Sequence, residues 1–294
     1  MGERTEMPGT DTANRVEYHS DGLTLVGDLW RTDEPRGTVV LLHGGGQTRH
    51  SWSRTGQRLG SHGWNALSLD CRGHGESGWA PDHDYSLDAL VADLRAVVAQ
   101  LGTRPVLVGA SMGGNTSLVA QGEHPGLARA LVLVDIVPRI EPKGVARIAA
   151  FMTARPDGFE SLDEVAEAVH AYNPHRARPA SPEGLRKNVR QHSDGRWYWH
   201  WDPAFVLGGD EPARAERFER VASAARAITV PTMLVRGRQS DIVSDEGVAE
   251  LLEMIPHARS VDVGNAGHMV AGDDNDLFTG SLADFLAGLP DDAV

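Results

Sequence analysis

A serine between two glycines occupies the junction of a predicted strand and a predicted helix. Residues 103–108 are a short apolar segment bounded by Gly and Pro, which is typical of a buried strand. Gly109-Ala110-Ser111-Met112-Gly113 follows, and residues 114–120 have the character of an opening helix. This is the nucleophile-elbow pattern G-x-S-x-G. The turn is so sharp that side chains two residues either side of the serine would collide, and Ser111 itself must accept a strained backbone. The pattern therefore predicts a serine hydroxyl that projects away from the sheet, where a substrate can reach it.

Composition limits the class of protein. The chain has 294 residues, of which 40% are hydrophobic, so it can bury a substantial core in one or two domains. Its net charge of −13 argues against nucleic acid or an anionic membrane as partner, because both require clustered Lys and Arg. The apolar runs fall short of the roughly 20 residues that a membrane helix needs, and no secretion-signal pattern is visible near the N-terminus. We therefore expect a soluble cytoplasmic protein.

Short apolar strands alternate with amphipathic helices over most of the chain. Residues 1–14 are polar and predict a loose tail, and two strands at 15–20 and 23–31 are joined by a tight Asp21-Gly22 turn. The alternation predicts a mostly parallel, twisted sheet with helices on both faces. The further strands are expected at 39–42, 64–70, 103–108, 130–134, 229–236 and 260–263, and the helices at 50–61, 86–101, 114–120 and 276–288.

The alternation is interrupted between residues 138 and 225. This stretch is helical in character, and we interpret it as a cap, or lid, over one end of the sheet. It contains the dense aromatic run Trp197-Tyr198-Trp199-His200-Trp201. Such a cluster can bury a large apolar area, either as the core of the cap or as the wall of a substrate pocket. A two-residue alternation turns the three tryptophans to one side, and Tyr198 and His200 to the other. Tyr198 and Trp199 are the candidate substrate-binding residues, and Phe151 and Met152 are further candidates for the pocket roof.

A serine hydroxyl needs a general base and an acid that orients the base. Asp241 lies in the loop after one predicted strand, and His268 lies in the loop after the next. In an open parallel sheet, the loops at the carboxyl ends of the strands share one crevice. We therefore predict that Ser111, Asp241 and His268 form a catalytic triad, in the chain order Ser…Asp…His.

A glycine-rich loop supplies a candidate oxyanion site. His43-Gly44-Gly45-Gly46 follows the strand at 39–42, and its glycines let the backbone approach a bound carbonyl. The backbone N–H groups of Gly45 and Met112 are the predicted oxyanion donors, with Gly44 beside the substrate. We expect His43 to brace this loop. Neither G-x-x-x-x-G-K-[ST] nor an opening G-x-G-x-x-G is present, so a phosphate-binding loop is a poor alternative.

Together these features resemble the α/β-hydrolase superfamily. The resemblance covers residues 15–137 and 226–290, and it includes Asp70-Cys71-Arg72-Gly73-His74-Gly75-Glu76-Ser77, which looks like the D-x-R-G-x-G-x-S segment of that superfamily. It implies structural roles for Asp70 and His74. It also implies a core of 15–137 and 226–294, with a cap at 138–225 inserted after the sixth strand. Cys71, the only cysteine, is expected to be a small buried residue.

Two departures from the pattern of particular family members limit which branch of the superfamily the chain resembles. Epoxide hydrolases and haloalkane dehalogenases use an aspartate where this chain has Ser111, so the serine argues against both and favours carbonyl chemistry. Some members, including lactonases that act on zearalenone, place the triad acid where this chain has Asp135, which is therefore the alternative to Asp241.

The resemblance implies a serine hydrolase without cofactor or metal, acting on a small to medium apolar ester or lactone through an acyl-enzyme. A C–C bond hydrolase or a perhydrolase with the same triad stays open, as does a small-ligand receptor on the same fold. Small-molecule substrates are the expected partners, and the oligomeric state stays open.

Overall fold

The computed structural model describes residues 12–174, 181–205, 211–264, 267–268 and 276–290. Almost all of the predicted N-terminal tail, residues 1–11, lies outside these ranges. Part of the loop that precedes His268 also lies outside them, at residues 265–266.

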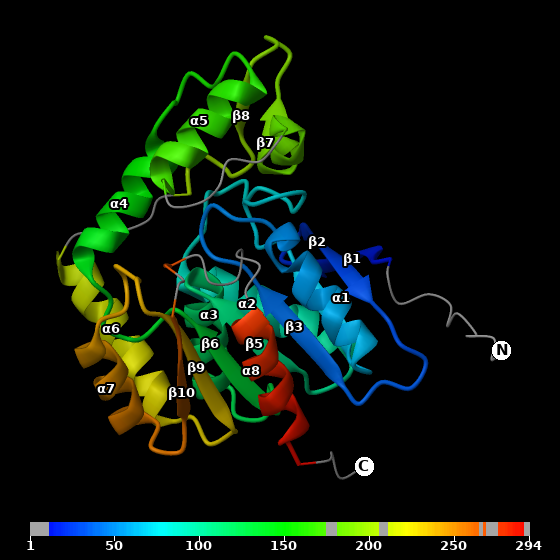
Figure 1. Ribbon diagram of the computed structural model, residues 1–294, viewed down its shortest axis with the longest axis vertical. Coiled ribbons are helices and arrows are strands. Elements are labelled where there is room, and N and C mark those ends of the chain that lie inside the picture. The colour runs from blue at the N-terminus through cyan, green and yellow to red at the C-terminus, as the bar shows by residue number, and fades with distance from the viewer. Residues whose placement is uncertain (1–11, 175–180, 206–210, 265–266, 269–275, 291–294) are drawn as a thin grey trace.

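The core is an eight-stranded sheet in the order β1-β2-β4-β3-β5-β6-β9-β10 (Figure 1). Strands β1 and β2 pair antiparallel to each other, β2 pairs antiparallel to β4, and all the other neighbours are parallel. The predicted mostly parallel sheet is therefore confirmed. Its strands are β1 (Asn14–Ser20), β2 (Leu23–Trp30), β3 (Thr38–Leu42), β4 (Asn65–Leu69), β5 (Val106–Ala110), β6 (Ala130–Val134), β9 (Thr232–Gly237) and β10 (Arg259–Val263).

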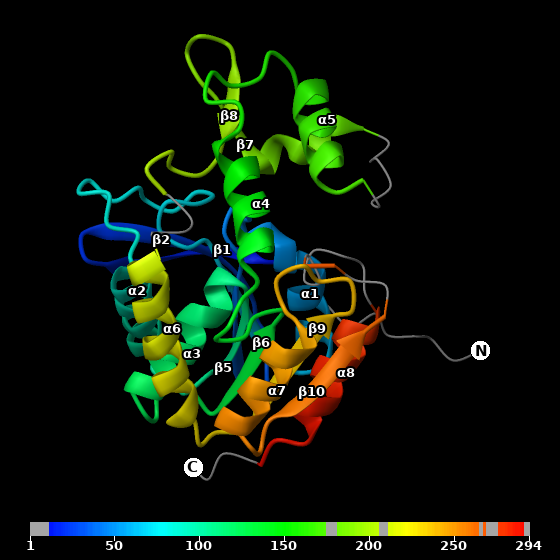
Figure 2. The same ribbon diagram turned by 90° about the vertical axis from the view of Figure 1, so that its left-hand side faces the viewer.

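The central strands are apolar on both sides because helices cover both faces of the sheet. Along β3, Val39 and Leu41 belong to one buried cluster, whereas Val40 and Leu42 belong to the other. This two-residue alternation is what a pleated strand dictates. Figure 2 shows the two layers of helices on either side of the sheet. One layer consists of α1 (Ser53–Ser61) and α8 (Asp276–Ala287), and the other of α2 (Leu87–Leu101), α3 (Met112–Glu123), α6 (Glu211–Arg226) and α7 (Asp245–Met254).

The two ends of helix α2 are set by capping residues that can be recognised in the sequence. The Ser86 hydroxyl accepts a hydrogen bond from the Ala89 N–H at the start of α2, as an N-cap serine does. Gly102 ends the same helix in the left-handed conformation, with φ of 67°, which a glycine adopts without steric cost.

An insertion follows the sixth strand and lies over the carboxyl ends of the core strands (Figure 1). We call residues 138–205 the insertion. Its described residues form two helices, a 3-10 helix and a two-stranded hairpin. Its elements are α4 (Pro142–Thr153), α5 (Leu162–Tyr172), η2 (Pro182–Asn188), β7 (Val189–Gln191) and β8 (Trp197–Trp199). A further 3-10 helix, η1 (Arg49–Trp52), follows the glycine loop in the core.

The insertion is shorter in the structure than the predicted range of 138–225. Helix α6, which falls within that predicted range, packs on α3 in the core. Val221, Ala224 and Ala225 belong to the main hydrophobic cluster, and a Cβ on Gly122 of α3 would lie only 2.4 Å from the Ala224 carbonyl oxygen. The close approach of these two helices requires that glycine and assigns α6 to the core. Among the described residues, no helix is both long enough and apolar enough to cross a membrane.

Candidate active site

Ser111 stands at the turn between β5 and α3. Its backbone has φ of 47° and ψ of −110°, a conformation that non-glycine residues rarely adopt. The Ser111 N–H donates to the Val134 carbonyl at 3.1 Å, which fixes the turn to the neighbouring strand β6. A Cβ on Gly109 would lie 2.3 Å from the Gly113 carbonyl oxygen, and a Cβ on Gly113 would lie 2.6 Å from the Leu42 Cβ. The two glycines of the predicted elbow are therefore sterically required, and the strained serine has the predicted geometry.

His268 pairs with Asp135. The Nδ1 atom of His268 lies 2.7 Å from Asp135 Oδ2, and the side chains of these two residues are 8% and 0% exposed. Since the carboxylate can only accept when ionised, Nδ1 carries the hydrogen and Nε2 of His268 is left as the basic nitrogen. This is the orienting contact that a general base requires.

Asp135 is held rigidly at the end of β6. It is fully buried, has φ of 49°, and donates its N–H to the Val235 carbonyl at 2.8 Å. Its carboxylate accepts hydrogen bonds from the Gly237 N–H at 3.0 Å and from the Ser240 hydroxyl at 2.5 Å. Together with His268, three donors therefore surround this carboxylate. Burying a carboxylate without such partners would cost a prohibitive amount of free energy.

The prediction that Asp241 orients His268 is wrong. Asp241 pairs instead with Arg147 of α4, through Oδ2 to Nε at 2.8 Å and Oδ1 to NH2 at 3.1 Å, and 40% of its side chain is exposed. The last residue of β9 contributes the Gly237 N–H and the loop after it contributes Ser240. Both support the carboxylate of Asp135, which follows the neighbouring strand β6. The carboxylate that contacts His268 therefore lies one strand closer to the elbow, at the alternative position Asp135.

The glycine loop lies against the elbow. A Cβ on Gly44 would lie 3.4 Å from the Ser111 Cβ, and the Gly113 N–H donates to the His43 carbonyl at 3.2 Å. The Gly44 N–H is taken by Gln47 Oε1 at 3.1 Å. The Gly45 and Met112 amides, by contrast, find no acceptor among the residues that the structure describes. Unpaired N–H groups are what an oxyanion site requires, so Gly45 and Met112 stay the candidate donors.

Two buried histidines support the glycine loop. His43 Nδ1 contacts the Gly44 carbonyl at 2.8 Å, and its Nε2 accepts from the Cys71 N–H at 3.0 Å. His74 Nε2 accepts from the Gly46 N–H at 3.1 Å. Complete burial lowers the pKa of His43 to about 4 and that of His74 to about 3, where the neighbouring His43 lowers it further. Both rings are therefore neutral hydrogen-bonding braces, as expected for His43.

The D-x-R-G-x-G-x-S segment is structural in its contacts. Asp70 accepts from the backbone N–H groups of Arg49 and Glu76 and from the Arg49 guanidinium. Arg72 forms a bidentate ion pair with Asp93, at 2.7 Å through both nitrogens. These contacts tie residues 70–77 to the core beside the glycine loop, which is the structural arrangement expected for Asp70.

The aromatic run is divided between two environments. Trp199 is buried in a cluster with Phe159 and Trp201, against which Phe151 and Met112 also pack, so the cluster meets the residue after Ser111. Tyr198 is not brought to the site. Its ring stacks on His192 with 4.3 Å between centroids, and its hydroxyl donates to Asp194 at 2.8 Å, at the tip of the hairpin. The prediction for Tyr198 is therefore wrong: Tyr198 directly precedes Trp199 in β8, and neighbouring residues of a strand point to opposite faces.

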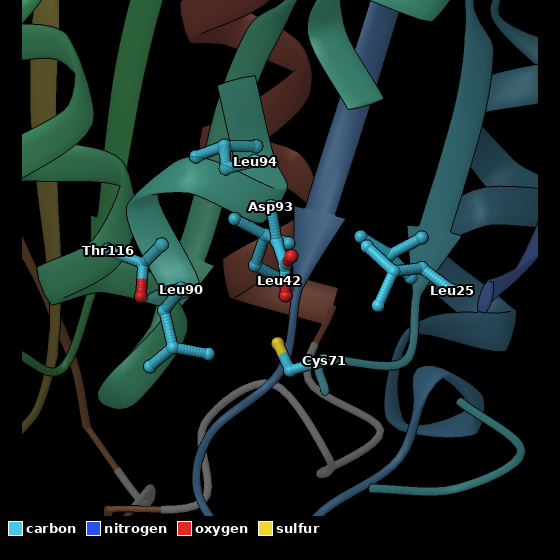
Figure 3. A pocket seen from close by; sticks show the side chains of 8 residues that line it. Leu25, Leu42, Cys71, Leu90, Asp93, Leu94 and Thr116 are labelled. Carbon is cyan, nitrogen blue, oxygen red and sulfur yellow. The ribbon is translucent and has the colours of Figure 1, made fainter. Parts of the chain in front are cut away.

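A small cavity elsewhere in the core is no substrate site. Figure 3 shows it between α2, α3 and the sheet, with Cys71 and Asp93 among its lining residues. Its volume of about 10 Å³ is close to the minimum for a single water molecule. Burial raises the pKa of the Cys71 thiol, so this cysteine has the character of a small apolar residue. Within the described ranges, no group of three or more His, Cys, Asp or Glu residues is arranged to hold a metal ion.

Comparison with known proteins identifies the family of the chain. A family model described as alpha/beta hydrolase fold matches residues 37–274. The chain belongs to the alpha/beta hydrolase family. Among the members similar to it is esterase Rv0045c of Mycobacterium tuberculosis, which is 32% identical over 256 residues, covering 83% of this chain and 80% of the relative. A crystal structure of that esterase superimposes with a TM-score of 0.75 at 27% identity, covering 94% and 92% of the two chains.

A second relative of this alpha/beta hydrolase is a monoacylglycerol lipase of Mycolicibacterium smegmatis. It is 36% identical over 253 residues, covering 80% of this chain and 81% of the lipase. These relatives establish the chain as a hydrolytic enzyme of the family.

Proposed function

We propose that this alpha/beta hydrolase is a serine hydrolase that cleaves a small to medium apolar ester or lactone through an acyl-enzyme. The observation that carries the proposal is the buried contact between His268 Nδ1 and Asp135, which leaves Nε2 available as a base. His268 follows β10, which is parallel to the elbow strand β5 in the same sheet, so both strands end at the same edge. The relatives named esterase and lipase support an ester as the substrate.

The proposed reaction has two stages, acylation of Ser111 and hydrolysis of the acyl-enzyme. His268 Nε2 takes the proton from Ser111 Oγ as the oxygen attacks the acyl carbon, and Asp135 stabilises the imidazolium that forms. The Gly45 and Met112 amides hold the negative oxygen of the tetrahedral intermediate. His268 then protonates the leaving alcohol, and afterwards activates a water that hydrolyses the acyl-enzyme and regenerates the serine.

The surroundings of the site support an apolar acyl group. Met112 packs against the aromatic cluster of the insertion, and a Cβ on Gly46 would lie 3.4 Å from Met152 Sδ of α4. The proposed pocket is therefore bounded by the glycine loop on one side and by aromatic and thioether side chains on the other. In this role the insertion acts as a cap that excludes water from the acyl group.

The test is an activity profile with p-nitrophenyl esters of increasing chain length and a panel of lactones. We expect turnover of apolar esters by the natural chain, loss of at least about a thousandfold in Ser111→Ala, and covalent labelling of Ser111 alone by a fluorophosphonate. Ser193→Ala, which alters an exposed serine in the hairpin, is the matched control and should be fully active. Unchanged turnover in Ser111→Ala would overturn the proposal.

A further inference from the structure

The glycine loop carries Gly45, whose N–H is a proposed oxyanion donor. Its orientation depends on the three peptide groups that follow Gly44, Gly45 and Gly46. The Gly44 carbonyl accepts from His43 Nδ1 at 2.8 Å and from the Gln47 N–H at 3.1 Å. In a planar trans peptide, the N–H of the next residue points opposite to that carbonyl. Holding the Gly44 carbonyl therefore fixes the direction of the Gly45 N–H, one of the two proposed oxyanion donors.

Gly46 is held on both sides by histidines. Its N–H donates to His74 Nε2 at 3.1 Å, and its carbonyl accepts from His200 Nε2 in a longer contact of 3.4 Å. Gly46 has φ of 73°, a left-handed conformation that glycine adopts easily but does not prefer over others. External contacts must therefore select this conformation of the loop.

His200 reaches the loop from the insertion. It directly follows β8, is only 1% exposed, and its Nδ1 accepts from the Gly75 N–H at 2.8 Å. Because Nδ1 is an acceptor, the hydrogen of the neutral ring lies on Nε2 and faces the Gly46 carbonyl. The ring of His200 lies 5.8 Å from that of His74, which lies 5.2 Å from that of His43. One continuous row of three buried rings thus runs from the insertion to the glycine loop.

The segment that carries His200 is anchored to the core independently. The Asp202 N–H donates to the Gly73 carbonyl at 2.9 Å, and the Asp202 carboxylate accepts from the Tyr85 hydroxyl. Arg190 of β7 donates to the Gly75 carbonyl. These contacts hold the backbone around His200 in place when its side chain is changed, so the effect of the side chain can be measured separately.

We propose that His200 is a positioning residue through which the insertion sets the oxyanion loop. Its Nε2–H holds the Gly46 carbonyl, and together with His74 it keeps the loop in the conformation that presents the Gly45 N–H to the substrate carbonyl. Full activity then requires the insertion to be docked on the loop at residues 73–75. This inference rests on the proposed function, because it assigns a role in forming the oxyanion site.

Two substitutions separate the two contacts of His200. Asn places an amide oxygen close to the position of Nδ1, so His200→Asn keeps the acceptor for the Gly75 N–H and loses the donor to Gly46. Gln places an amide nitrogen close to the position of Nε2, so His200→Gln keeps the donor to Gly46 and loses the acceptor. His192→Gln and His192→Asn make the same changes at an exposed position of the same hairpin and serve as controls.

The expected result is a loss of kcat that follows the Gly46 contact. Removing an oxyanion donor outright costs about 10²- to 10³-fold in kcat, and a displaced donor costs less, so we expect about a tenfold loss in His200→Asn. KM should stay within about twofold, because ground-state binding does not use the oxyanion donors. Binding of an alkyl trifluoromethyl ketone, which forms a tetrahedral oxyanion on the serine, should weaken by about the same factor of ten. His200→Gln and both His192 variants should retain kcat within about threefold.

A purely structural role would give a different result. Both His200 variants would then lower the melting temperature and leave kcat and trifluoromethyl ketone affinity unchanged in the folded enzyme, which would overturn the inference. Equal losses of kcat in His200→Asn and His200→Gln would also overturn it. If the natural chain hydrolyses no ester, the proposed function itself is wrong, and the role of His200 falls with it. If Ser111→Ala is inactive while His200→Asn is fully active, only the role of His200 fails.

Discussion

Asp135 and His268 are 133 residues apart in the chain, yet Asp135 Oδ2 lies 2.7 Å from His268 Nδ1. The acid at this position follows β6, the strand next to the elbow strand β5 in the sheet. The end of β9 and the loop that carries Asp241 support the Asp135 carboxylate, through the Gly237 N–H and the Ser240 hydroxyl. The site is therefore built from the ends of four adjacent strands, β5, β6, β9 and β10, with the second supplying the acid.

Replacing Asp135 should separate the two candidate acids. Asp135→Asn keeps the shape of the side chain but no longer stabilises the imidazolium, so we expect kcat to fall by about 10³- to 10⁴-fold. Asp241→Asn removes only an exposed ion pair with Arg147, of the kind that contributes about 0–1 kcal/mol, and kcat should stay within about threefold. Steady-state kinetics on a p-nitrophenyl ester measure both. A large loss in Asp241→Asn with an active Asp135→Asn would contradict the assignment.

Ser240 should act on the reaction through Asp135. Its hydroxyl donates to the same carboxylate oxygen that His268 contacts, and accepts from the Ile242 and Val243 N–H groups. In Ser240→Ala the carboxylate loses a donor and its fixed orientation, so we expect kcat to fall by about three- to tenfold with little change in KM. Ser240→Thr retains the hydroxyl and should recover most of kcat. Full activity of Ser240→Ala would show that the Gly237 N–H suffices to orient the acid.

Most of the sheet and the elbow could be predicted because they depend on local patterns. The apolar β-branched strands, the Ser86 N-cap and the G-x-S-x-G turn carry their own signals, and each lies where the pattern indicated. The choice between Asp135 and Asp241 could not be made in this way, because both aspartates follow strands that end at the same edge of the sheet. It depends on how each loop turns. Asp135 points inward from a backbone with positive φ, whereas Asp241 meets Arg147 of the insertion.

The insertion was the least predictable part for a related reason. A two-residue alternation correctly separated Trp199 from Tyr198, but it grouped Tyr198 with His200. Strand β8 ends at Trp199, so the alternation no longer applies at His200, which turns to the core instead. The assignment of α6 to the insertion failed because its partner surface on α3 requires the small Gly122, and a contact between distant helices leaves no local pattern.

The three buried histidines should make the protein sensitive to mild acid. Burial lowers the pKa of His43 to about 4, of His74 to about 3, and of His200 well below its ordinary value. Below about pH 6.5 the unfolded chain binds protons at these residues while the folded chain does not, so the free energy of unfolding falls as the pH falls. Between pH 7 and 5.5 the loss is about 1 kcal/mol for each histidine, or roughly 3 kcal/mol together.

Urea unfolding at the two pH values measures this loss. His200→Gln removes one of the three titrating groups, so its free energy of unfolding should fall by about 1 kcal/mol less than that of the natural chain over the same interval. His192→Gln should fall by the same amount as the natural chain. A free energy of unfolding that does not change between pH 7 and 5.5 would contradict the neutral state of the three rings.

Gly109 should be the glycine of the elbow that tolerates substitution least. A Cβ there would lie 2.3 Å from the Gly113 carbonyl oxygen and 2.6 Å from the Gly114 nitrogen, and both are backbone atoms that cannot move without displacing the start of α3. We expect Gly109→Ala to lower the free energy of unfolding by about 3 kcal/mol or more, since overpacking against backbone exceeds the usual cost of an added methyl group. Gly184→Ala is the control, because a Cβ at that position meets no atom within 4 Å, and it should change stability by no more than about 0.5 kcal/mol. Chemical denaturation measures both variants. If Gly109→Ala folded with natural stability and kept its activity, the elbow would have to differ from the sharp turn that places Ser111 at the mouth of the site.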